Sequence, residues 1–176
     1  NALATPMKTT IEAIRACDHE SEPLCRTHED YPLLASRPGA GTVYAARLTA
    51  AMGTVRDRWT TVDELLCFSG VAPVMERRGK STWIRWRYFC PTFLRQSFHA
   101  YAGESLNHSF WARAYYMSQR ARGKSHQAAV RALAFKWIRI IYKCWQTRTP
   151  YSEVRYLESL RKKGSPLLTF AANNPS

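Results

Sequence analysis

The chain lacks the features of membrane-spanning and of disulfide-stabilised secreted proteins. No apolar run approaches the roughly 20 residues that a membrane-spanning helix needs, and no charged then apolar leader with a cleavage site opens the chain. The five cysteines are widely spaced, with no Cys-x-x-Cys pair, so we interpret them as reduced residues and not as a zinc site or a disulfide framework. We expect a cytoplasmic protein without membrane association. Because the chain opens at Asn1, we also expect it to be a piece of something longer.

Acidic residues are scarce outside the N-terminal end. Lys and Arg number 26 and Asp and Glu 13, which gives a formal net charge of +13. Six of the acids lie in residues 1–30, so residues 31–176 hold 23 basic side chains against seven acidic ones. Since net charge governs association and not fold, this excess favours a polyanionic partner, namely nucleic acid. An anionic membrane surface is the alternative.

Familiar catalytic patterns are absent as well. The chain contains no Gly-x-Ser-x-Gly, His-Glu-x-x-His or P-loop pattern. The seven acids of residues 31–176 are scattered and form no obvious two-metal site. We therefore predict no metal ligand and no cofactor in this chain. From the residues alone, the sequence indicates an all-α, basic domain that binds nucleic acid.

Residues 31–70 are typical of a helix-hairpin-helix unit. An apolar segment leads into the turn Pro38-Gly39-Ala40-Gly41, and an alanine-rich helix follows up to Gly53. Glycines allow a sharp turn and leave the first amides of the next helix uncovered, which suits a phosphate oxygen. The alternative is that the glycines only let two helices pack closely. We predict nucleic-acid contacts from Arg37, Gly39, Gly41, Thr42 and Arg47.

The N-terminal residues 1–30 are predicted to form the end of a coiled-coil arm. Ile11 and Ile14 belong to a loose helical apolar spacing among acids. Pro23 is expected to interrupt or kink the helix. The alternative is a cut-off helix whose partner lies outside this chain.

Residues 71–90 have no helical period and are predicted to be a basic loop, with a short strand or hairpin as an option. Interleaved aromatic and cationic side chains are typical of surfaces that follow a nucleic-acid strand, because aromatics stack on bases and cations hold phosphates. Trp83 or Trp86 could equally plug the core beneath arginine stems. The predicted contacts here are Arg77, Arg78, Lys80, Arg85 and Arg87.

Residues 91–164 are predicted to form a small helical bundle, and residues 165–176 a loose tail. The longest helix begins after Ser125, a suitable N-cap, and continues to about Trp145. One of its faces is apolar, and another carries the predicted contacts Lys136, Arg139 and Lys143. A solvated face is the alternative, but residues 77–148 hold 15 basic residues against Glu104 alone, which favours contact.

Five blocks of the sequence resemble the C-terminal transposase domain of the IS110 family of insertion-sequence recombinases, also called the IS116/IS110/IS902 type. They are SRPGAGTVYAARLTAAMG, WTTVDELLCFSGVAPV, ERRGKS, CPTFLRQSFHAYA and RARGKSHQAAVRALAFKWIRIIYKCWQTRTPY. The resemblance covers residues 7–163. It implies a partner domain, outside this chain, of RuvC-like fold with acidic residues that bind magnesium. It also implies a serine nucleophile, duplex DNA as partner, a guide RNA in some members, and a homo-oligomer formed through a coiled coil.

The chain departs from the family at the nucleophile. By the resemblance, the serine precedes a glycine shortly after a Gly-x-x-Pro block, and here Arg78 occupies that place before Gly79. An arginine cannot attack a phosphodiester and form the ester that a serine forms. Ser81 would serve only if the loop shifts its register, so we expect this chain alone to be inactive. The prediction is a DNA-binding transposase domain in a bacterial nucleoid; the alternative is a non-enzymatic helix-hairpin-helix module for DNA or RNA.

Overall fold

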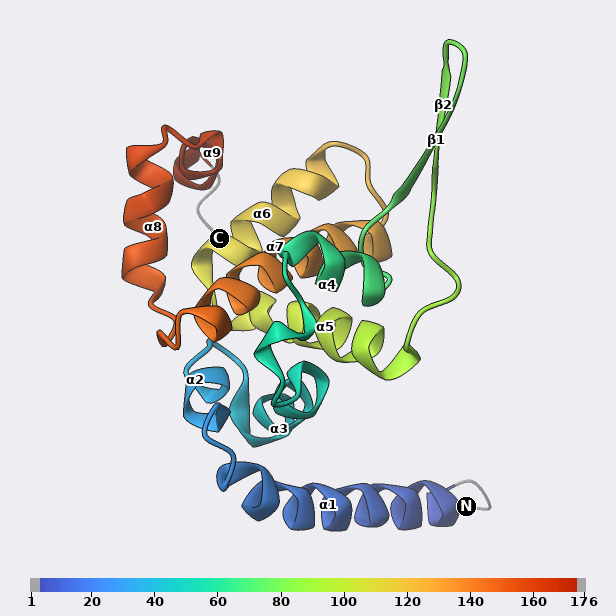
Figure 1. Cartoon of the computed structure of the whole chain (residues 1–176), viewed down its shortest axis with the longest axis vertical. Coiled ribbons are helices and arrows are strands. Elements are labelled where there is room, and N and C mark those ends of the chain that lie inside the picture. The colour runs from blue at the N-terminus through green and yellow to red at the C-terminus, as the bar shows by residue number, and fades with distance from the viewer. Residues whose placement is uncertain (1–3, 174–176) are drawn as a thin grey trace.

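The computed structural model describes residues 4–173 and confirms a mostly α-helical protein (Figure 1). Two short 3₁₀ helices, Arg56–Arg58 and Ser105–Asn107, complete the helical part. The α-helices are α1 (Ala4–Arg26), α2 (Tyr31–Ala35), α3 (Gly41–Met52), α4 (Val62–Phe68), α5 (Thr92–Glu104), α6 (Phe110–Ala121), α7 (His126–Gln146), α8 (Glu153–Lys162) and α9 (Pro166–Asn173). The strands are β1 (Val74–Arg78) and β2 (Ser81–Arg85). In residues 4–173, no helix combines the length and apolar character that crossing a membrane requires.

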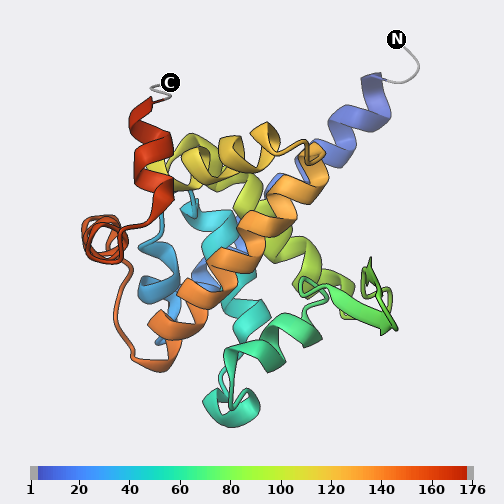
Figure 2. The ribbon, with the colours of Figure 1, turned by 90° about the horizontal axis from the view of Figure 1, so that it is seen from above.

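Helix α7 lies at the centre of the fold and crosses the helical body in Figure 2. Helices α4, α5 and α6 pack against it. Its apolar stripe is fully buried and includes Leu133, Trp137, Ile141 and Trp145. The ring of Trp137 lies 4.7 Å from the ring of Trp111, and its Nε1 donates a hydrogen bond of 2.8 Å to Ser105 Oγ. Burial of these large rings supplies much of the free energy that holds the helices together.

A buried polar cluster joins three distant parts of the chain. The Asp30 carboxylate accepts a hydrogen bond of 3.0 Å from Trp145 Nε1 and forms an ion pair with Arg56. Arg56 also donates to the carbonyl oxygen of Trp145, and its guanidinium lies 5.1 Å from the Trp145 ring centroid. The cluster therefore holds the start of α2 and the Arg56–Arg58 turn against the end of α7.

We predict that Asp30→Ala lowers the free energy of unfolding by about 3–5 kcal/mol, because it leaves the Arg56 charge without its buried partner. Urea unfolding followed by circular dichroism measures the change. Glu29→Ala is the matched control, since its ion pair with Arg148 is exposed and worth at most about 1 kcal/mol. Equal losses in the two variants would contradict a structural role for the cluster.

Helix α1 forms the expected arm, and it continues through Pro23 (Figure 1). The expected interruption at Pro23 is wrong. Proline removes only the one hydrogen bond that its own amide would donate, and α1 ends soon after Pro23, at Arg26. No residue of α1 is buried, and the apolar side chains Met7, Ile11, Ile14 and Leu24 are exposed.

The expected loose tail is replaced by helix α9 over residues 166–173; residues 174–176 lie outside the described part of the chain. Leu167 and Ala171, one helical turn apart, are buried, and α9 packs against α6. Pro166 is suited to the first position of a helix. The prediction failed because so short an apolar pattern does not identify a helix unless the surface that it packs against, here α6, is known.

Candidate nucleic-acid interface

The turn at Gly39-Ala40-Gly41 joins α2 to α3, and the two helices pack together. Gly39 has a φ of +73°, and a Cβ there would lie 2.6 Å from His108 Cδ2. Close packing therefore accounts for Gly39. Gly41 and Thr42 are exposed at the start of α3, and a Cβ on Gly41 would meet open space.

The structure contradicts a surface contact by Arg37, whose side chain is only 3% exposed. Its Nη1 donates a hydrogen bond of 3.2 Å to the carbonyl oxygen of Leu33, and burial lowers the pKa of the guanidinium. The buried guanidinium lies near the side chains of Tyr101, Cys144 and Tyr151. Arg47 is half-buried, with its guanidinium 5.4 Å from the ring centroid of Phe93.

Replacing Gly39 by alanine should destabilise the fold by more than the same change at Gly41. Both residues have positive φ, which costs an alanine about 1–2 kcal/mol, and only Gly39→Ala also forces His108 to move. Thermal unfolding of the two variants measures the difference. Equal stabilities would show that the approach of His108 does not constrain this turn.

Strands β1 and β2 form an antiparallel hairpin that stands away from the helical body (Figure 1). Of the structures considered for residues 71–90, the hairpin is therefore the one that is observed. A two-residue turn of Gly79 and Lys80 closes it, and the φ of +58° at Gly79 suits a turn that requires glycine at its first central position. All side chains of β2 are exposed.

The register places Arg78 directly opposite Ser81 at the tip of the hairpin. Opposed residues of an antiparallel pair share one face, so these two side chains emerge together without any shift of register. Glu76 and Arg85 on the same face form an exposed ion pair of 3.2 Å. In residues 4–173, the cations Arg77, Arg78 and Lys80 have no ion-pair partner. The tip thus presents unpaired positive charge together with the hydroxyl of Ser81 on the Arg78 face.

Arg87 does not belong to this exposed group. It follows the hairpin and is half-buried, and its Nη2 lies 3.5 Å from Cys67 Sγ. Its carbonyl oxygen accepts a hydrogen bond of 3.4 Å from Arg95 Nη1. Arg87 therefore fixes the return of the hairpin to the body and is not positioned like the tip cations.

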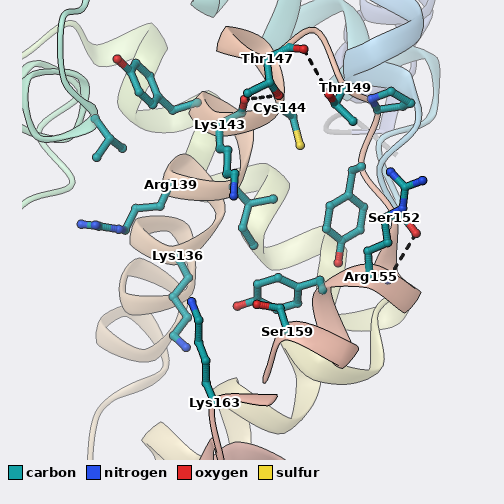
Figure 3. A pocket seen from close by; sticks show the side chains of 16 residues that line it. Lys136, Arg139, Lys143, Cys144, Thr147, Thr149, Ser152, Arg155, Ser159 and Lys163 are labelled. Carbon is teal, nitrogen blue, oxygen red and sulfur yellow. Dashed lines mark hydrogen bonds between the residues drawn. The ribbon is translucent and has the colours of Figure 1, made fainter. Parts of the chain in front are cut away.

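A second basic surface is a groove of about 870 Å³ between α7 and α8, here called the α7–α8 groove (Figure 3). Five cations line it: Lys136, Arg139, Lys143, Arg155 and Lys163. No acidic residue of the described chain lines it, although Asp63 outside the groove lies 3.5 Å from Arg139. Burial lowers the pKa of Lys136, whose Nζ lies 4.3 Å from the ring centroid of Tyr115.

Sequence reasoning found the three cations on α7 and missed the two contributed by the α8 segment. Arg155, Ser159 and Lys163 are four residues apart, so they lie on one helical face. That spacing was a usable signal, but it does not reveal that the face turns toward α7. Lys163 and Lys136 both line the groove, one from each side (Figure 3).

The residues present do not fit a magnesium site. Across residues 4–173, no three side chains of His, Cys, Asp or Glu lie close enough together to hold a metal ion. No chemical step of this chain is therefore derived through a metal.

Comparison with known proteins assigns the chain to a class of mobile-element proteins. The sequence profile of the Transposase IS116/IS110/IS902 family matches residues 31–117. The chain belongs to this family. Over 171 residues it is 31% identical to the mini-circle putative transposase for IS117 of Streptomyces coelicolor, a match that covers 97% of this chain and 40% of that protein.

Two further relatives belong to insertion elements. The insertion element IS110 uncharacterized 43.6 kDa protein of Streptomyces coelicolor is 29% identical over 154 residues, which cover 85% of this chain and 37% of that protein. The insertion element IS900 uncharacterized 42 kDa protein of Mycobacterium paratuberculosis is 28% identical over 128 residues, which cover 72% and 32%. The matches thus span at most 40% of the length of these relatives.

Proposed function

We propose that this chain is a DNA-binding part of an insertion-sequence transposase. The observation that carries the proposal is the α7–α8 groove, which is lined by five cations from α7 and the α8 segment and by no acidic residue of the described chain. Like charges brought together repel one another, and a bound polyanion relieves that repulsion. Duplex DNA offers closely spaced phosphates that such cations neutralise.

The hairpin supplies a second contact in this proposal. A two-stranded antiparallel ribbon fits the major groove of DNA. Arg77, Arg78 and Lys80 stand at its tip, away from the helical body, where they are free to reach phosphates. We assign the hairpin and the α7–α8 groove to DNA, with Gly41 and Thr42 as a further backbone contact.

Catalysis by this chain alone is not part of the proposal. Arg78 lies where the resemblance expects the serine nucleophile, and an arginine cannot form a phosphoester with DNA. We propose that magnesium is held by acidic residues outside this chain. Assembly of two or more copies through the exposed apolar side chains of α1, and the use of a guide RNA, belong to the same proposal.

Binding to duplex DNA should weaken steeply with salt, and the double variant Lys143→Gln/Arg155→Gln should reduce that dependence. Each phosphate contact that is lost lowers the slope of log K against log salt by about 0.9, so the expected reduction is about 1.8 if each cation holds one phosphate. Fluorescence anisotropy at several salt concentrations measures the slope.

The control is Arg161→Gln/Lys162→Gln, which removes the same charge from α8 at residues that do not line the groove. Equal reductions in both double variants would show that net charge, and not the groove, causes the salt dependence of DNA binding. An absence of duplex binding in the wild-type chain at low salt would overturn the proposed function.

Incubation with DNA should give no covalent adduct on a denaturing gel, because the expected nucleophile position holds Arg78. The hydroxyl of Ser81 lies beside that position, so Ser81→Ala is the informative variant. An adduct in the wild-type chain that disappears in Ser81→Ala would show that Ser81 has taken over the reaction.

A further inference from the structure

An aromatic pocket lies at the base of the hairpin, and neither the cations of the hairpin tip nor the residues of the α7–α8 groove line it. It has a volume of about 380 Å³, within the range of about 300–1,000 Å³ that small-ligand sites occupy. The end of the hairpin forms one wall, and α6 and α7 form the other. The aromatic residues that line the pocket are Trp86, Tyr115 and Phe135.

The pocket opens to solvent with apolar walls. Trp86 remains 37% exposed, and Ile84 at the same wall is 63% exposed. Apolar surface left facing water costs free energy, and a contiguous patch of it commonly marks a binding site. A flat, apolar ligand would recover this cost by covering the rings.

Two cations line the pocket as well. The Arg131 guanidinium carbon lies 3.7 Å from the ring centroid of Trp86, so the two planar groups are in close contact. Lys124 lies at the same pocket, and no acidic residue of residues 4–173 lines it. Rings next to unpaired cations match a ligand that has a flat π-face and a negative charge.

The pocket adjoins the α7–α8 groove. Tyr115 lines the pocket, Lys136 lines the groove, and Lys136 Nζ lies 4.3 Å from the centroid of the Tyr115 ring. Phe135 and Lys136 are neighbours on α7, one directed to each site. A strand that passes Lys136 at the end of the groove is therefore next to the aromatic pocket.

We propose that this aromatic pocket receives one unpaired base of the strand whose phosphates occupy the α7–α8 groove. The inference rests on the proposed function and names its substrate as a strand with an unstacked base. Inside a duplex both faces of a base are covered by its neighbours, so a base must leave the stack before it can lie against Trp86.

The test compares a duplex with the same duplex carrying one bulged 2-aminopurine. We expect the chain to bind the bulged duplex more tightly and to change the 2-aminopurine fluorescence. Trp86→Ala should weaken bulge binding by about 5- to 150-fold, because stacking on an aromatic ring is worth about 1–3 kcal/mol per base. Its affinity for the perfect duplex should change less than about twofold.

Two further variants separate the pocket from general effects. Trp83→Ala removes the same side chain from the hairpin outside the pocket, so it should leave the preference for the bulge unchanged. Ala132→Phe fills the pocket while keeping Trp86, so it should abolish the preference even if Trp86→Ala disturbs the hairpin. Repeating the measurement with the bulged strand made of RNA shows whether the pocket binds a DNA base or an RNA base. Tighter binding of the bulged substrate in either form supports the inference.

Equal wild-type affinity for the bulged and the perfect duplex would overturn this inference and leave the proposed function intact. The inference would also be overturned if Trp86→Ala and Ala132→Phe lowered the affinity for the bulged and the perfect duplex equally. Failure of the proposed function looks different, because no salt-dependent binding to either duplex would then be seen.

Discussion

Burial of the aromatic face of α7 is the constraint on which the other features depend. Trp137 and Trp145 are fully buried on one side of this helix, and the ring of Trp111 from α6 packs against Trp137. When one face of a helix is buried in the core, its opposite face is directed toward the surface of the protein. The cations of α7 are therefore exposed at fixed positions, and the position of α8 decides what lies opposite them.

The candidate binding surfaces follow one another along α7. Its N-terminal half, with Arg131 and Phe135, forms a wall of the aromatic pocket at the base of the hairpin. Its C-terminal half, with Lys136 and Lys143, forms a wall of the α7–α8 groove. Because one rigid helix carries both sites, a base and the phosphates next to it would be held at a constant spacing.

Helix limits were predictable where the signal is local. Ser125 accepts a hydrogen bond of 3.3 Å from the amide of Ala128, so the predicted N-cap of α7 is present. The failures concern packing at a distance. Arg37 is buried near Tyr101 and Tyr151, which lie far from it in the sequence, and α9 packs against α6.

The sequence by itself determined the helical class, the family and the position of the basic excess, because periodicity, motif order and charge are properties of neighbouring residues. Only the tertiary structure decided which side chains meet. It set Ser81 opposite Arg78, brought Arg155 and Lys163 into the same groove as Lys136, and placed Trp86 on Arg131. These pairs come from separate elements, whose mutual arrangement is set by packing around the α7 core and by strand register.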